Sequence, residues 1–316
     1  SKYFPASKKI PLDKFIFNAL YNKNFGYYSK RIPFGKNGDF ITAPKISNLF
    51  SEIIAIWIIS AWHTFGKPKN FNVIELGPGD GSLTKILLKV FNRFPEFDKA
   101  KKIYLYEVSN YLKNLQKKNI KSNEIKWIRN FSKINNGPTI FFGNEFFDAI
   151  PIKQFKREKG LLFEKFYTLD KNHKIKEIFK KVSKLDAANI NSFKSLRKLK
   201  FIEFPKYGFE ELKKIIKKIY QVKGCLLLID YGYLNPKNHS TLQSVIRHKK
   251  NNLLNNLGKA DVTYHVNFKL LTEFLIKNNL KVEKIIPQQR FLKNMGIINR
   301  AEIIGRKMKF KEQSNM

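Results

Sequence analysis

The chain has 316 residues, and its 61 lysine and arginine side chains against 25 aspartate and glutamate side chains give a formal net charge of +36. This length allows a substantial buried core, so we expect one core domain that carries an elaboration. The lone cysteine, Cys225, excludes an internal disulfide framework and a thiolate metal cluster, and the five histidines lack the paired spacing of a zinc site. We therefore expect no metal ion.

The excess positive charge has two interpretations. Lysine and arginine that neutralise phosphates bind nucleic acid without sequence preference. The basic residues here are spread from Lys2 to Lys311, and they accompany abundant asparagine, isoleucine and phenylalanine, which all have A/T-rich codons. A diffuse field attracts anions without specifying a site. We favour a base-composition bias and expect no specific nucleic-acid partner, with an RNA substrate kept as an alternative.

No segment of the sequence predicts a membrane span. The longest uncharged apolar run, residues 53–62, is shorter than the roughly 20 residues that a bilayer requires. The first residues show no uninterrupted apolar stretch of the kind found in secretory signals. We expect the cytoplasm of a bacterium or, if a leader has been removed, the mitochondrial matrix.

The N-terminal part begins with helical patterns. Residues 11–21 have apolar side chains at helical spacing after a proline, and glycines and prolines then punctuate a long loop. A buried helix follows over residues 45–66 and ends at Gly66. We assign residues 1–70 to an N-terminal helical extension with a lid loop.

Short apolar strands then alternate with helices. Strands are expected at residues 72–76, 102–108, 125–129, 138–144 and 224–233, with helices from Ser82, up to about Lys118, and over residues 208–220. This alternation predicts an α/β fold with a parallel, doubly wound sheet. We assign residues 71–151 and 205–306 to the two parts of this core.

Between the two parts of the core lies a segment of a different pattern. Residues 152–204 contain strand-like pieces separated by polar turns such as "DKNH", which predicts an inserted antiparallel, β-rich subdomain. Peripheral surfaces of this kind carry substrate recognition in open α/β proteins. Residues 307–316 form a charged tail that we expect to be flexible.

A glycine-rich turn, "ELGPGDG", follows the first core strand. Gly77, Gly79 and Gly81 allow tight turning and let a ligand approach backbone N–H groups, and Pro78 lies within the same turn. Ser82 stands where a dinucleotide fingerprint needs glycine, and the lysine of a P-loop is missing. NAD and ATP are therefore disfavoured.

S-adenosyl-L-methionine fits this turn better, because it carries no phosphate. Glu107 ends the second strand, where a carboxylate can accept hydrogen bonds from both ribose hydroxyls. The alternative is a plain strand-to-helix turn and a solvated acidic residue. We favour the cofactor because these residues occur together.

Two acidic residues follow the fourth strand, in "NEFFDAIP". Asn144 ends the strand, and Glu145 and Asp148 flank the position at which we expect methyl transfer. Paired carboxylates suit a guanidinium, whose planar donors bind bidentate acceptors. In the alternative interpretation, Asp148 caps a helix that begins near Ala149 and Glu145 is only a strand-end acid.

The sequence resembles the MidA family of S-adenosyl-L-methionine-dependent methyltransferases, which includes a mitochondrial complex I assembly factor with protein-arginine methyltransferase activity. The matching segments include "GDFITAP", "VIELGPGDGSL", "YLYEVS", "GNEFFDAIPIKQF", "LLIDYGY", "TLQSVIRHK" and "GKADVTYHVNF". They cover most of the chain, with residues 156–202 and the tail matched only weakly.

The resemblance implies a Rossmann-like class I methyltransferase that binds its cofactor at Gly77, Pro78, Gly79, Gly81, Glu107 and Asn144. It also implies that "GDFITAP" folds over that site, which nominates Asp39, Phe40 and Thr42. Glu145, Asp148 and His265 are the candidate catalytic residues, with Asp230, Tyr231 and Asp261 as second-tier candidates. His265 has two alternative roles, removal of a proton or a purely structural one.

The predicted function is methylation of a protein arginine side chain during assembly of a respiratory or other complex. Two alternatives stay open: an assembly chaperone that keeps the cofactor as a structural ligand, and an RNA methyltransferase. The expected partner is a protein substrate, and a homodimer is an open alternative for the oligomeric state.

Overall fold

The computed structural model describes residues 2–5, 9–30 and 48–306, and the chain divides into two compact units. Unit 1 comprises Ser1–Pro33, Glu145–Lys217 and Asp230–Val282; unit 2 comprises Phe34–Asn144, Lys218–Ile229 and Glu283–Met316. The expected lid residues Asp39, Phe40 and Thr42 and the expected tail 307–316 lie outside the described residues.

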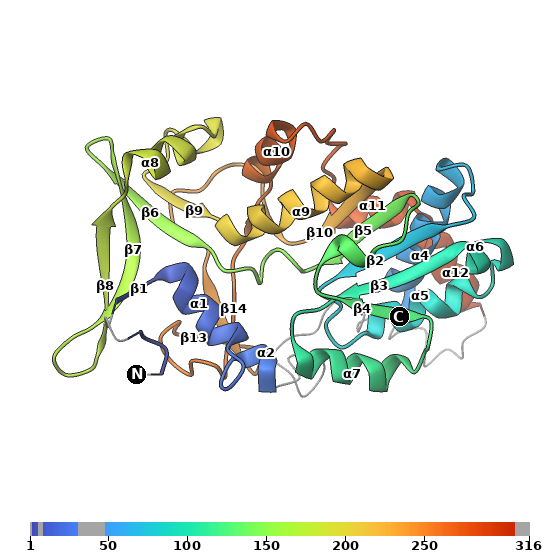
Figure 1. Ribbon diagram of the computed structural model, residues 1–316, viewed down its shortest axis with the longest axis horizontal. Helices are drawn as coiled ribbons and strands as arrows, with labels where there is room; N and C mark the ends of the chain where they lie inside the picture. Colours follow the sequence, from blue (N-terminus) through green and yellow to red (C-terminus); the bar gives the residue numbers. More distant parts are fainter. Residues whose placement is uncertain (1, 6–8, 31–47, 307–316) are drawn as a thin grey trace. The chain divides into compact units, whose positions relative to one another are not determined.

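Unit 2 is built on a five-stranded parallel sheet with the order β10-β5-β2-β3-β4 (Figure 1). Its strands are apolar along most of their length because a parallel sheet is covered on both faces; all six residues of β2 are buried. The strands are β2 (Phe71–Leu76), β3 (Lys101–Tyr106), β4 (Ile125–Ile128), β5 (Thr139–Asn144) and β10 (Gly224–Ile229).

The strand order of unit 2 reverses between β2 and β5. β3 and β4 follow β2 outward on one side, whereas β5 and β10 lie on its other side. In doubly wound sheets, ligands bind outside the carboxyl ends of the strands at such a switch point. The predicted doubly wound α/β fold is confirmed, and its ligand-binding edge is the one at which β2 ends.

Helices pack on this sheet and bury an aromatic core. Trp62, Phe71, Phe91 and Phe97 belong to one buried cluster with the sheet's aliphatic side chains. The helices are α4 (Asn48–Thr64), α5 (Ser82–Phe91), α6 (Pro95–Ala100), α7 (Asn110–Ile120), η1 (Phe131–Lys133), α11 (Gln288–Asn294) and α12 (Ile297–Gly305), and α9 (Lys206–Val222) runs from unit 1 into unit 2. Among the described residues, no helix is long and apolar enough to cross a membrane.

Unit 1 contains an antiparallel sheet of order β1-β7-β6-β9, with β8 paired to β7. A second antiparallel sheet has the order β13-β12-β14, and β11 pairs with β15. The strands are β1 (Lys9–Pro11), β6 (Lys153–Glu158), β7 (Leu161–Leu169), β8 (Ile175–Lys181), β9 (Phe201–Phe204), β11 (Gly232–Tyr233), β12 (Gln243–Ile246), β13 (Lys249–Asn251), β14 (Asp261–Thr263) and β15 (Val266–Asn267). The helices are α1 (Leu12–Tyr21), α2 (Tyr27–Lys30), α8 (Lys184–Asn191), η2 (Lys194–Leu196) and α10 (Phe268–Lys277).

The inserted segment 152–204 forms the antiparallel strands that its alternating pattern predicts. One difference is that β1, from the N-terminal region, completes this sheet through pairs such as Ile10 with Tyr167. The other is α8, where Ser183 caps the helix by accepting a hydrogen bond from the Asp186 backbone N–H. A strand of three residues is too short for its sequence pattern to be recognised unless its pairing partner is known.

The buried aromatic side chains of unit 2 should contribute strongly to its free energy of unfolding. The ring of Phe97 is fully buried, so we expect Phe97→Ala to lower the free energy of unfolding of unit 2 by about 3–5 kcal/mol. Phe94→Ala removes a ring that is 38% exposed, and we expect a loss below about 1 kcal/mol. Urea denaturation followed by tryptophan fluorescence measures both, because Trp57, Trp62 and Trp127 all lie in unit 2. Equal losses in the two variants would contradict this account of the core.

Candidate functional site

The glycine turn lies between β2 and α5, at the switch point of the parallel sheet. Gly77, Gly79 and Gly81 have φ angles of 61°, 58° and 82°, which side chains rarely adopt. The backbone N–H of Gly77 donates to the Tyr106 carbonyl at 3.1 Å, and that of Gly81 donates to the Pro78 carbonyl at 2.8 Å. The turn therefore presents backbone without side chains at the end of β2, as the sequence pattern predicts.

Glu107 lies just after β3, beside this turn. Its carboxylate is only 7% exposed, and it accepts hydrogen bonds from the Ser109 backbone N–H at 2.7 Å and from Gln116 Nε2 at 3.0 Å. Burial raises the pKa of the Glu107 carboxyl to about 7. A buried carboxylate with lone pairs to spare at this sheet edge fits the paired hydroxyls of a ribose.

Gln116 is a site residue that the sequence analysis missed. Its amide nitrogen donates to the Gly79 carbonyl oxygen at 2.8 Å as well as to Glu107, and its Oε1 accepts from the Trp127 indole at 2.9 Å. The sequence carries one signal for it: Gln116 stands four residues from both Leu112 and Ile120, on the apolar face of α7. A fully buried amide on such a face needs polar partners from other elements.

Asn144 ends β5 and pairs in register with Ile229 of β10. Its side-chain Oδ1 is buried and has no hydrogen-bond partner among the described residues. Buried polar atoms are nearly always paired in folded proteins. An unpaired acceptor at this strand end is consistent with a ligand contact there.

The acidic segment after β5 enters unit 1 as a turn and not as a helix. Glu145 has a φ angle of 51°, and the backbone N–H groups of Phe147 and Asp148 both donate to Oδ2 of Asp230, at 2.9 and 3.1 Å. The alternative in which Asp148 caps a helix beginning near Ala149 is therefore wrong. Asp230, which directly follows β10, holds this turn in place.

Asp148 is a buried carboxylate with one unused oxygen. It is 4% exposed; its Oδ2 accepts a hydrogen bond from the Tyr231 hydroxyl, and its Oδ1 has no partner among the described residues. Burial, followed by the charge of Asp230, raises the pKa of Asp148 well above its usual range. Burial also raises the pKa of Asp230, to about 7. Two neighbouring carboxyls are thus held ready to take up a proton or a cation.

Further acidic and phenolic groups surround Asp148. The Tyr28 hydroxyl donates to both oxygens of Asp261, at 3.0 and 3.1 Å, and both residues are buried. The charge of Asp261 also contributes to the raised pKa of Asp148. The Tyr264 hydroxyl is buried without a partner among the described residues. These residues form what we call the acid–tyrosine cluster: Tyr28, Asp148, Asp230, Tyr231, Asp261 and Tyr264.

His265 lies next to the acid–tyrosine cluster. Its ring stands edge-on to the Tyr231 ring with centroids 5.5 Å apart, and its backbone N–H donates to Thr241 Oγ1 at 3.0 Å. Burial, together with the charge of Lys237, lowers the pKa of His265, so the imidazole is neutral at pH 7. A neutral, half-buried imidazole can accept a proton.

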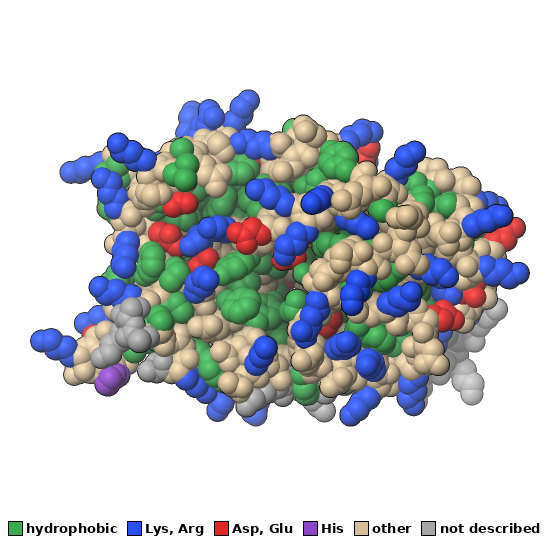
Figure 2. Space-filling model, viewed as in Figure 1, with side chains coloured by type: hydrophobic (Ala, Val, Ile, Leu, Met, Phe, Trp, Pro, Cys, Tyr) green, Lys and Arg blue, Asp and Glu red, His purple; other side chains and the backbone are tan. Residues whose placement is uncertain are grey.

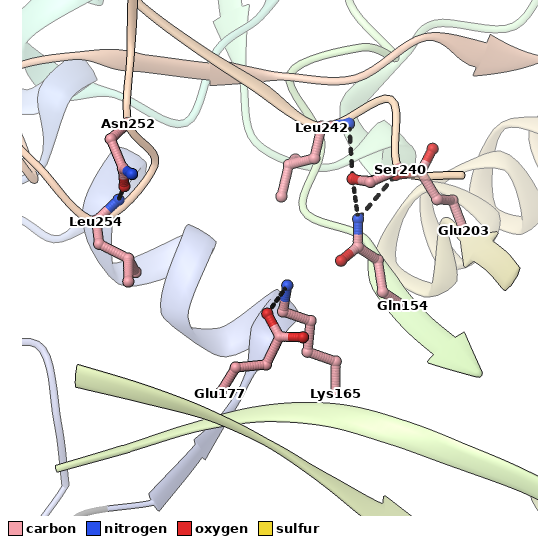
Figure 3. A network of polar contacts seen from close by, with 8 residues as sticks. All are labelled: Gln154, Lys165, Glu177, Glu203, Ser240, Leu242, Asn252 and Leu254. Atoms are coloured by element: carbon pink, nitrogen blue, oxygen red, sulfur yellow. Dashed lines mark hydrogen bonds and ion pairs between the residues drawn. The ribbon is translucent and has the colours of Figure 1, made fainter. Parts of the chain in front are cut away.

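A buried polar network supports the loop that carries Thr241. Glu203 accepts hydrogen bonds from the Thr241 backbone N–H at 3.0 Å and from Gln154 Nε2 at 2.8 Å. Gln154 also donates to Ser240 Oγ at 2.7 Å, and Figure 3 shows Gln154 beside Ser240 and Glu203. The Thr241 hydroxyl donates to Glu203 and accepts from the His265 backbone. Glu203 thereby fixes, through Thr241, the backbone at His265.

The charge of the surface is diffuse. Lysine and arginine side chains are spread over the face shown in Figure 2 and do not gather over one element. Within the described parts of the chain, no group of three or more His, Cys, Asp or Glu side chains could hold a metal ion. The face shown therefore carries no focused basic patch.

The structure brings the expected residues together in two groups. Gly77, Pro78, Gly79, Gly81 and Glu107 lie at one edge of the parallel sheet of unit 2, with Asn144 at the end of β5. Glu145, Asp148 and His265 belong to unit 1, and Asp148 and His265 both contact Tyr231 there. A parallel sheet with a glycine turn after its first strand and an acidic residue after its second defines a nucleoside-cofactor-binding α/β protein.

The chain belongs to the family described as "Putative S-adenosyl-L-methionine-dependent methyltransferase", whose model matches residues 53–286. The protein is thus an S-adenosyl-L-methionine-dependent methyltransferase, and the expected cofactor is confirmed. The resemblance inferred from the sequence motifs is also confirmed. The glycine turn and Glu107 fit this cofactor, because neither presents a phosphate-binding lysine and both leave polar groups at the same sheet edge.

Curated relatives extend over nearly the whole chain. "Protein arginine methyltransferase NDUFAF7, mitochondrial" of Danio rerio is 29% identical over 322 residues, covering 95% of this chain and 76% of the relative. The protein of the same name from Homo sapiens is 28% identical over 321 residues, covering 93% and 72%. A crystal structure of a COG1565 superfamily member from Burkholderia thailandensis bound to S-adenosyl-homocysteine matches with a TM-score of 0.80 at 20% identity, covering 98% of this chain and 81% of that one. This structural likeness confirms the fold.

We expect a side chain at Gly79 in the glycine turn to weaken cofactor binding. A valine at Gly79 would disfavour the φ angle of 58° that the turn requires. We expect Gly79→Val to weaken S-adenosyl-L-methionine binding at least about tenfold in calorimetry. Gly160→Val is a matched control, because Gly160 has a φ angle of 78° in a hairpin of unit 1 with open space around it. Unchanged binding by Gly79→Val would contradict the assignment of the turn.

Because the Glu107 carboxyl has a raised pKa, we expect the affinity for the cofactor to depend on pH. The ionised carboxylate accepts hydroxyl hydrogen bonds, whereas the protonated form would turn one oxygen into a donor. With its pKa at about 7, we expect S-adenosyl-L-methionine to bind about tenfold more weakly at pH 6 than at pH 8. Calorimetry on Glu107→Gln gives the baseline, because this variant lacks the Glu107 carboxyl and reports the titration of the remaining groups, which include Glu75 and the ligand's own amino group. An identical pH dependence in both proteins would contradict the ribose role of Glu107.

Proposed function

We propose that this methyltransferase acts on the guanidinium group of a protein arginine. The observation that carries the proposal is the acid–tyrosine cluster, in which Asp148 and Asp261 are buried and Asp230 is half-buried. The charges that perturb the pKa of Asp148 are those of Asp230, Asp261 and Glu145, all of them acidic. Buried carboxylates without a compensating cation are costly. A cationic substrate would offset the negative charge around Asp148.

A guanidinium suits this cluster better than other cations do. It is planar, always charged and carries five N–H donors in a fixed fork. The unpaired Oδ1 of Asp148 is an acceptor for such a donor, and the unpaired Tyr264 hydroxyl can accept another. Two relatives that match most of the chain are named protein arginine methyltransferases, which supports the same substrate class.

The strained backbone at Glu145 also supports a functional role for this segment. A φ angle of 51° at a non-glycine residue costs free energy, and such residues cluster at functional sites. The strain occurs directly after Asn144, where the chain leaves β5. We propose that this conformation aims the Glu145 carboxylate at the substrate, next to that of Asp148.

The chemistry requires removal of one proton. When bound, S-adenosyl-L-methionine supplies an electrophilic methyl group on a sulfonium. As an arginine nitrogen forms its bond to that carbon, the carbon–sulfur bond breaks, and the methylated nitrogen must lose a proton. Asp148, with its raised pKa, is suited to take that proton, and the neutral His265 beside Tyr231 is the second candidate acceptor.

The setting of the reaction is proposed from the relatives and the sequence motifs together. The named relatives are mitochondrial, which supports the matrix among the compartments expected from the sequence. We propose that the substrate is a subunit of a respiratory or other complex, methylated during assembly. A homodimer stays a prediction, which light scattering of the purified protein tests.

Asp148→Asn is the variant that tests the acidic site. The amide keeps the size of the side chain but cannot hold a guanidinium as an ion pair or take its proton. We expect methyl transfer to fall at least about hundredfold while S-adenosyl-L-methionine binding stays within about twofold. Asp186→Asn, at an exposed aspartate of α8 in the same unit, should leave both unchanged. Full activity of Asp148→Asn would overturn the role of the cluster.

The substrate class is tested with labelled cofactor. The purified protein is incubated with S-adenosyl-L-methionine carrying a labelled methyl group and a lysate of a strain that lacks the gene, and the labelled species is hydrolysed and identified. Methylarginine from a protein band is the expected product. Label in another amino acid would overturn the arginine proposal, and label in RNA would replace the substrate class.

A further inference from the structure

Gln116 makes three hydrogen bonds through one fully buried side-chain amide. Nε2 donates to the Gly79 carbonyl oxygen at 2.8 Å and to Glu107 Oε2 at 3.0 Å, and Oε1 accepts from Trp127 Nε1 at 2.9 Å. The indole N–H can only donate, and the carbonyl and carboxylate oxygens are acceptors. The orientation of the amide is therefore determined by its partners.

The partners of Gln116 come from three different elements. Gly79 belongs to the turn after β2, Glu107 follows β3, and Trp127 lies on β4. The glycine turn is the segment that we assign to the amino-acid part of the cofactor, and Glu107 is the residue that we assign to its ribose. One side chain of α7 thus connects the two protein segments that hold the two ends of one ligand.

We propose that Gln116 is a positioning residue for S-adenosyl-L-methionine: it fixes the glycine turn and the ribose-binding carboxylate of Glu107 in one geometry. This role is independent of the methyl acceptor, so it stands whether or not the substrate is an arginine. Gln116 acts through Gly79 and Glu107, and we do not place it in contact with the cofactor.

Gln116 also affects the charge of Glu107. Burial raises the pKa of this carboxyl, and four groups oppose that rise: the backbone N–H groups of Ser109 and Val108, the Gln116 amide and the charge of Arg129. Removing the amide removes one donor that favours the carboxylate. The pKa of Glu107 then rises further, which shifts cofactor binding to higher pH. A side chain that only filled space would not produce that shift.

The test measures the dissociation constant of S-adenosyl-L-methionine by calorimetry between pH 5.5 and pH 9. Gln116→Met keeps the length of the side chain and loses all three hydrogen bonds. We expect the affinity at pH 7 to fall about tenfold or more, with the midpoint of the pH dependence moved upward. Binding within about twofold of the parent, with the same midpoint, would overturn the proposal.

Asn119→Ala provides the matched control. Asn119 lies three residues further along α7, and its side-chain amide donates to the Asp80 carbonyl of the same turn at 2.9 Å. No hydrogen bond joins it to Glu107 among those described. We expect its pH midpoint to stay at that of the parent. An equal shift in both variants would show that any loosening of α7 has the same effect, and would overturn the specific role of Gln116.

Trp127→Phe is a second variant that tests the proposal if Gln116→Met does not fold. It removes only the indole donor that orients the Gln116 amide, while an aromatic ring remains beneath the ammonium group of Lys117. We expect a smaller loss of affinity, about twofold to fivefold, and a midpoint shift in the same direction. Unchanged affinity and midpoint in Trp127→Phe, with Gln116→Met unable to fold, would likewise overturn the proposal.

Discussion

Parallel pairing of β2 with β3 and β5 is the constraint on which the candidate cofactor site depends. Leu76 pairs with Tyr106, so Gly77 and Glu107 leave the sheet at the same level. The same pairing brings Asn144 of β5 to this edge. Because parallel strands end together, a turn, a carboxylate and an amide that are far apart in the chain become one polar edge. The buried aromatic core beneath the sheet holds that edge rigid.

Buried carboxyls occur in both units, and their environments set different roles. Glu107 accepts several hydrogen bonds and lies near the positive charge of Arg129, and these oppose the rise in its pKa that burial causes. Asp148 lies among other acids and keeps one oxygen unpaired. Similar burial therefore gives a candidate acceptor for ribose hydroxyls in one case and a candidate cation site in the other. The difference comes from neighbouring charges and donors.

Much of this organisation follows from local sequence patterns. The apolar runs of the parallel strands and the apolar periods of the helices α1, α5, α7 and α9 predict these elements. Glu107 and the glycines were found because their residue types are unusual at strand ends. Gln116 was not found, because its three partners come from elements that only the folded sheet brings together. The same reason applies to β1, whose three residues gain their meaning from pairing with β7.

The sequence by itself determined the fold class, the glycine turn after β2, the acidic residues after β3 and β5, and membership of a methyltransferase family. These depend on residue types at fixed spacing along one segment, which folding does not alter. Only the tertiary structure decided that Asp230 holds the Glu145–Asp148 turn, that Tyr28 bonds to Asp261, and that Gln116 joins Gly79 to Glu107. Hydrogen-bond partners and burial depend on distances between residues remote in the chain, and no local pattern encodes those distances.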